Sequence, residues 1–136
     1  MDFTIHHAAI SATHMAESIQ FYKNFGFKVV LHWKDPDGAL EIAHLKLADN
    51  YLEIFWYREQ TSAPRTSESL ATDLPRIGIK HFALKVDSVH EAKKFVEDRG
   101  LASNVEIQAG RTGITYFFIK DPSGISVEFL EDKRGL

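Results

Sequence analysis

The chain has 136 residues, a formal net charge of −3 and no cysteine. A chain of this length normally folds as one domain that buries about 68% of its unfolded surface, so its core needs no disulfide. The lack of cysteine excludes thiolate metal ligands and thiol nucleophiles, and it favours a cytoplasmic protein. Because Lys and Arg are scattered among acidic residues and no apolar run reaches about 18 residues, we expect neither nucleic acid nor a membrane as a partner.

The first half of the chain predicts a strand, a helix and three more strands. Residues 4–11 form an apolar stretch typical of a buried strand, and residues 14–25 have helical spacing that ends at Gly26. Turn-forming residues then separate three further stretches with strand composition. These predicted strands span residues 27–34, 40–47 and 50–57.

The second half repeats this order after a connecting segment. Residues 58–76 are rich in Ser, Thr, Pro and Arg and show little periodicity, so they form either a plain connector or a flap over a site. Ser88 and Glu91 have capping-box spacing at the start of the second helix, and Gly100 ends it. The second set of predicted elements comprises a strand at 79–86, a helix at 88–99 and strands at 104–108, 114–120 and 125–131.

Equivalent residues recur at a fixed interval in the two halves. The sequence IHHAAI returns as IKHFAL, which places His81 74 positions after His7 (81 − 7 = 74). Each half also carries one later glutamate inside an apolar strand, Glu53 in the first and Glu128 in the second. A repeat of this length indicates a duplicated module, so the sequence predicts two tandem βαβββ modules.

The repeated histidines and glutamates are candidate metal ligands. A carboxylate in the middle of an apolar strand is costly to bury alone, and a bound cation offsets that cost. Imidazole and carboxylate donors without sulfur suit Zn, Ni, Co, Mn or Fe and do not select among them. Without the support of this duplication, the remaining histidines are interpreted as ordinary surface or core residues: His6, His14, His32, His44 and His90.

Four motifs resemble the vicinal oxygen chelate superfamily and, within it, glyoxalase I-like proteins of the glyoxalase/bleomycin resistance/dioxygenase group. They are IHHAAI and IKHFAL at the start of the modules, LEIFWY at the end of the first, and FIKDPSGISVEFLE at the end of the second. The similarity covers essentially the whole chain. It implies an α+β fold with modules at about 4–57 and 78–131, joined by residues 58–76 into a single domain of residues 1–136. The modules would form one curved eight-stranded mixed sheet around a metal cleft.

The resemblance also implies a site and its chemistry. His7, Glu53, His81 and Glu128 would bind one divalent ion, and a small-molecule substrate would bind that ion through two adjacent oxygens. Glu128, with Glu53, would move a proton alpha to a carbonyl through a metal-bound enediolate, as in a glyoxalase I-like lyase or isomerase. We expect a homodimer whose cleft is built within one chain or between modules of two chains.

Two positions depart from glutathione-dependent bacterial glyoxalase I. Those enzymes have an arginine four residues after the first histidine and an asparagine four residues after the first glutamate, where this chain has Ser11 and Tyr57. We therefore predict metal chemistry of the glyoxalase type with poor use of glutathione adducts. The alternatives are a non-haem Fe(II) dioxygenase with two histidines and one carboxylate, an acyl-CoA epimerase, and a non-catalytic module that binds an antibiotic.

Overall fold

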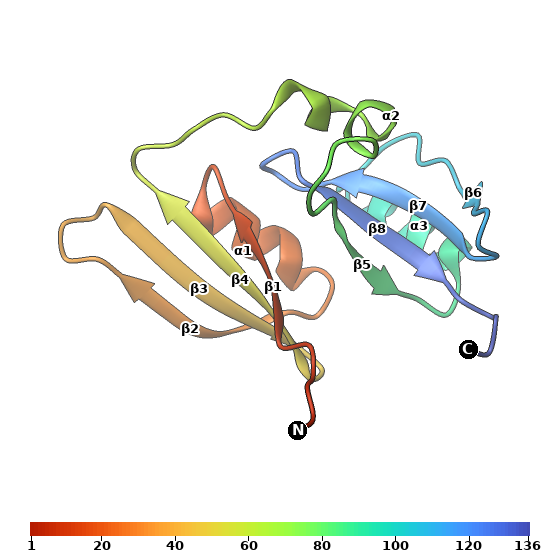
Figure 1. Ribbon diagram of the computed structural model, residues 1–136, viewed down its shortest axis with the longest axis horizontal. Helices are drawn as coiled ribbons and strands as arrows, with labels where there is room; N and C mark the ends of the chain where they lie inside the picture. Colours follow the sequence, from red (N-terminus) through yellow and green to blue (C-terminus); the bar gives the residue numbers. More distant parts are fainter. The chain divides into compact units, whose positions relative to one another are not determined.

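A computed structural model describes residues 1–136 as two compact units, Met1–Ala63 and Pro64–Leu136 (Figure 1). Each unit contains one four-stranded mixed sheet and one longer helix. The α+β fold and the duplication predicted from the sequence are confirmed. The prediction of one eight-stranded sheet is wrong, because the strands hydrogen-bond only to strands of their own unit. None of the helices has the length and apolar composition that a membrane span requires.

The first unit has the predicted element order. Its sheet has the strand order β1-β4-β3-β2, with β1 parallel to β4 and the other pairs antiparallel. The last two strands have the bounds predicted for them. The elements are β1 (His7–Ser11), α1 (Met15–Lys23), β2 (Lys28–Lys34), β3 (Leu40–Leu47) and β4 (Asn50–Tyr57).

Helix α1 packs against β4 and covers one face of the first sheet (Figure 1). Leu52 and Ile54 of β4 are buried on that face, and Tyr22 of α1 is fully buried. Because side chains alternate along a strand, Glu53 and Phe55 lie on the opposite face. Glu53 therefore lies on the face of the sheet that α1 does not cover.

The second unit repeats this arrangement. Its sheet order is β5-β8-β7-β6, and α3 packs against β7 and β8. The backbone N–H of Glu91 donates to Ser88 Oγ at the start of α3, which confirms the predicted N-cap. The elements are η1 (Arg65–Glu68), α2 (Leu70–Asp73), β5 (Phe82–Lys85), α3 (Val89–Asp98), β6 (Gln108–Ala109), β7 (Thr115–Lys120) and β8 (Ser126–Glu131).

The strand predicted at 104–108 is largely irregular, since β6 begins only at Gln108. Two side chains of α3 occupy the backbone groups of Val105 that a neighbouring strand would otherwise use. Val105 N–H donates to Glu97 Oε1 at 3.1 Å, and Lys93 Nζ donates to the Val105 carbonyl at 2.8 Å. Tertiary hydrogen bonds thus replace the sheet ladder at this point.

The segment 58–76, expected to be a connector or a flap, contains two short helices, η1 and α2, between residues 65 and 73. Ser69 caps α2 by accepting from Thr72 N–H. Asp73 at its end binds Arg76, with 3.0 Å between Oδ1 and Nε. Much of the segment is therefore ordered by its own polar contacts.

Candidate metal centre

The two sheets place the candidate glutamates at equivalent positions. In the first unit Glu53 pairs with Ala9 of the parallel strand β1, and in the second Glu128 pairs with Ala83 of β5. The motif Asp-Pro-Ser-Gly forms the turn before β8, where Asp121 Oδ1 accepts from two backbone N–H groups. This turn helps to fix where β8 begins and so which face Glu128 occupies.

In the first unit His7 lies beside Glu53. His7 Nε2 is 3.7 Å from Glu53 Oε1, and the side chains are 43% and 20% exposed. The other ring nitrogen, Nδ1, lies 3.0 Å from Nδ1 of His6, whose ring is stacked on Tyr51. An imidazole that donates from Nδ1 keeps its Nε2 lone pair for an ion, so the contact with His6 suits a metal ligand.

The second unit forms the corresponding pair with His81, which lies immediately before β5. His81 Nε2 is 2.9 Å from Glu128 Oε2, and these side chains are 23% and 10% exposed. The rings of Phe118 and His81 pack perpendicular to each other, with 4.8 Å between ring centroids. His81 Nδ1 is buried without a hydrogen-bond partner, so the contact of Nε2 with Glu128 and packing against Phe118 orient this ring.

The donor set fits a divalent ion. Each unit directs an imidazole Nε2 at a carboxylate, and both donor types suit borderline divalent metals. Each unit brings together two of the four predicted ligands. No three His, Asp or Glu side chains are arranged to hold one ion. We call each pair a half-site, because it offers one nitrogen donor and one oxygen donor and holds two of the four predicted ligands.

Two histidines that the sequence analysis interprets as ordinary surface or core residues lie against the half-site of the first unit. His6 contacts His7, as described above, and His44 Nε2 is 2.7 Å from Glu53 Oε2. His44 faces Glu53 directly across the antiparallel pair β3–β4. The hairpin register could have revealed this contact, because the turn after Leu47 fixes which residues of the two strands face each other.

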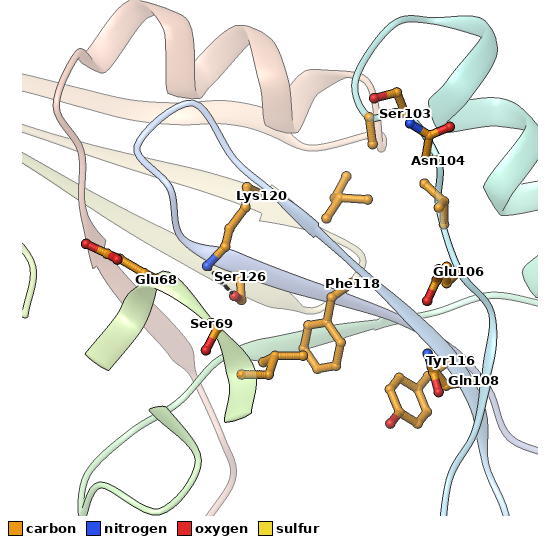
Figure 2. A pocket seen from close by; sticks show the side chains of 14 residues that line it. Glu68, Ser69, Ser103, Asn104, Glu106, Gln108, Tyr116, Phe118, Lys120 and Ser126 are labelled. Atoms are coloured by element: carbon orange, nitrogen blue, oxygen red, sulfur yellow. Dashed lines mark hydrogen bonds between the residues drawn. The ribbon is translucent and has the colours of Figure 1, made fainter. Parts of the chain in front are cut away.

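A pocket of about 500 Å³ lies in the second unit (Figure 2). Phe118 lines it and also contacts His81, so this ring links the pocket to the half-site, although neither His81 nor Glu128 lines the pocket. Lys120 points towards Ser126 in Figure 2, and its Nζ donates to Ser126 Oγ at 2.9 Å. Ser103 lies on the loop at the opposite side. The pocket thus offers one aromatic wall and several hydroxyl and charged groups; the FIKDPSGISVEFLE motif contributes Phe118, Ile119, Lys120 and Ser126, whereas the rest of the lining belongs to no motif.

The residues that replace the expected glutathione contacts lie on the same sheet face as Glu53. Ser11 pairs with Phe55, and Tyr57 stands four residues after Glu53 on the same strand. The arginine nearest in sequence, Arg58, donates from Nη1 to the carbonyl of Asp37 in the β2–β3 turn. No arginine of β1 or β4 therefore replaces the arginine that glutathione-dependent enzymes have at this position.

Comparison with known proteins gives one family. The family model described as "Glyoxalase/Bleomycin resistance protein/Dioxygenase superfamily" matches residues 4–129, and no curated protein matches. Among solved structures, a glyoxalase family protein from Enterococcus faecalis is 28% identical, covering 94% of this chain and 97% of that one, with a TM-score of 0.76. Lactoylglutathione lyase from Agrobacterium tumefaciens is 27% identical, covering 98% and 97%, with a TM-score of 0.68. The trypanothione-dependent glyoxalase I of Leishmania major shares the fold at 22% identity, covering 97% and 88%, with a TM-score of 0.69.

Proposed function

We propose that this chain, which belongs to the Glyoxalase/Bleomycin resistance protein/Dioxygenase superfamily, is a metal-dependent lyase or isomerase of the glyoxalase I type. The family predicted from the motifs is confirmed, and the reaction is our proposal. The observation that carries it is the repeated pair of one imidazole and one carboxylate. The two glutamates lie at equivalent register positions of the two sheets, each beside a histidine.

The proposed ligands of one divalent ion are His7, Glu53, His81 and Glu128. When bound, such an ion would polarise the carbonyl group of a substrate. The donor set accommodates Ni, Zn, Co, Mn or Fe and does not choose among them. Glu128 is mostly buried and has the His81 ring as its partner, and a buried carboxylate is costly unless it is compensated. Binding a cation beside it would supply that compensation.

Glu128 is the proposed general base. Its carboxylate would remove a proton from the carbon next to the substrate carbonyl and return it to the neighbouring carbon, so that no oxidant or reductant is consumed. The low exposure of Glu128 excludes water and helps to retain the proton between the two transfers. A substrate with two adjacent oxygens, such as an α-hydroxy carbonyl compound, allows this proton transfer between neighbouring carbons.

The substrate is proposed to be something other than a glutathione adduct. Ser11 and Tyr57 provide no charged contact where glutathione-dependent enzymes have arginine and asparagine. The pocket lined by Phe118 instead offers Phe118 and Lys120 to the remote part of the substrate.

The protein is expected to be a homodimer. Strand β2 is an edge strand of its sheet and carries exposed Val30, Leu31 and Trp33. Apolar side chains exposed on a sheet edge favour association with another chain. Light scattering after size-exclusion chromatography measures the mass, and a monomeric mass at all concentrations would contradict this expectation.

The proposed reaction is tested by metal analysis followed by solvent-exchange experiments. The purified protein should contain a divalent ion, and in D₂O the loaded protein should introduce deuterium into an α-hydroxy carbonyl substrate. Oxygen consumption by the Fe(II) form with no solvent exchange would instead support the dioxygenase alternative. Tight binding without exchange or turnover would support the binding module.

A further inference from the structure

The two half-sites differ at one equivalent position. Across the antiparallel strand pair, Glu53 faces His44 in the first unit, whereas Glu128 faces Phe118 in the second. The interval between His44 and Phe118 is 74 residues (118 − 44 = 74), the same as between His7 and His81. The duplicated framework therefore holds a hydrogen-bonding side chain beside one carboxylate and an aromatic ring beside the other.

His44 binds one particular oxygen of Glu53. Its Nε2 donates to Oε2 at 2.7 Å, while His7 Nε2 lies 3.7 Å from the other oxygen, Oε1. The side chains of His44 and Glu53 are 32% and 20% exposed, and partial burial strengthens a hydrogen bond that involves a charged acceptor. The bond to His44 restricts rotation of the carboxylate and directs Oε1 towards His7.

We propose that His44 is a positioning residue that fixes Glu53 as a stationary metal ligand and thereby leaves proton transfer to Glu128. This inference rests on the proposed function and assigns different roles to the two carboxylates. With Oε2 held by His44, Glu53 would ligate the ion through Oε1. A carboxylate held on one oxygen is well suited to ligation and poorly suited to moving between an ion and a substrate carbon.

Glu128 lacks such an anchor. Phe118 occupies the position opposite it, and an aromatic ring offers its carboxylate no hydrogen bond. Its hydrogen-bond partner in the structure is His81, which is itself a proposed ligand. Once His81 ligates an ion through Nε2, Glu128 keeps the freedom that a proton carrier needs.

A double-mutant cycle on metal affinity tests the role of His44. His44→Phe, which copies the second unit, should lower affinity for Co(II) about 10- to 100-fold in chelator competition, the usual effect of removing a residue that orients a ligand. In the Glu53→Ala background the same substitution should change affinity by no more than about threefold, because its target is absent. His44→Gln keeps an N–H donor and should restore most of the loss.

The visible spectrum of the Co(II) form gives a second readout. It should change in His44→Phe and return towards the wild-type spectrum in His44→Gln, because coordination by Glu53 depends on the bond to its second oxygen. Equal losses of affinity in both backgrounds would make His44 an independent ligand and overturn the proposal. Wild-type affinity and spectrum in His44→Phe would overturn it as well.

The variant His81→Ala distinguishes failure of the proposed function from failure of the role proposed for His44. If His81→Ala binds Co(II) as tightly as the wild type, the four-ligand site fails and the proposed function fails with it. If His81→Ala binds Co(II) more weakly than the wild type while His44→Phe binds it equally tightly, only the role of His44 is refuted.

Discussion

The consequences of changing Glu128 to glutamine follow from its surroundings. Taken as a whole residue, Glu128 is 7% exposed, and its neighbours in sequence, Val127 and Phe129, are 0% and 3% exposed. Glutamine has nearly the same size, so the apolar neighbours should keep their packing. The amide still forms a hydrogen bond with His81, but it carries no charge and accepts no proton at neutral pH.

Glu128→Gln should therefore slow deuterium exchange strongly while changing the free energy of unfolding little. The free energy of unfolding should change by about 1 kcal/mol or less, the net contribution of one hydrogen bond. Deuterium exchange into the substrate should fall about 10²- to 10⁴-fold, which corresponds to about 3 to 5 kcal/mol of barrier. Metal affinity should also fall, because one anionic ligand becomes neutral.

The assay is proton NMR of the substrate in D₂O, with enough metal added to saturate both proteins. Glu91→Gln is the matched control, because Glu91 is an exposed glutamate at the start of α3 and its variant should exchange deuterium at the wild-type rate. Thermal unfolding of the metal-free proteins checks that the fold is intact. If metal-saturated Glu128→Gln exchanged deuterium as fast as the wild type, Glu128 would not be the base.

Two further predictions address the substrate and the fold. The wild type should turn over the methylglyoxal–glutathione adduct poorly, and Ser11→Arg combined with Tyr57→Asn should raise kcat/KM for it about 10- to 100-fold by supplying the missing polar contacts; efficient wild-type turnover with any of the metals would refute this. Phe117 is fully buried and stacked on Phe129 with 5.0 Å between ring centroids, so Phe117→Ala should lower the free energy of unfolding in urea by roughly 3 to 5 kcal/mol. A loss below about 1 kcal/mol would show that this pair is not part of the core.

The regular parts of the fold could be predicted because local signals agree with one another. Strands 40–47 and 50–57 were predicted with their observed bounds, since the short turn between them leaves few alternatives and the alternation of side chains fixes the faces. The helices likewise begin and end within about two residues of the predicted bounds, which is the usual uncertainty of helix ends. These local features are enough to place Glu53 and Glu128 on the sheet faces opposite the long helices α1 and α3.

Features that depend on tertiary contacts could not be predicted in the same way. The composition of residues 104–107 predicts a strand. Lys93 and Glu97 of α3 instead bind the backbone of Val105, and the segment is irregular. The pocket beside Phe118 combines residues from η1, α2, β6, β7, β8 and the loop before β6, and no periodicity relates them.

His44 is an intermediate case. It was interpreted as an ordinary histidine because no histidine occupies the equivalent position in the second module, yet that difference is what distinguishes the two half-sites. The predicted strand bounds, 40–47 and 50–57, imply that residues 44 and 53 face each other if residues 47 and 50 flank the turn, as they do in the structure. The cross-strand neighbours of a candidate ligand on a hairpin therefore carry a signal for residues such as His44.

The most direct test of the central claim is the metal content and affinity of His81→Ala beside the wild type and His90→Ala. His90 is an exposed histidine of α3, so its variant controls for non-specific binding through imidazole. We expect about one divalent ion per chain in the wild type and in His90→Ala, and loss of most of that ion from His81→Ala. Full metal content with unchanged affinity in His81→Ala would contradict the proposed site.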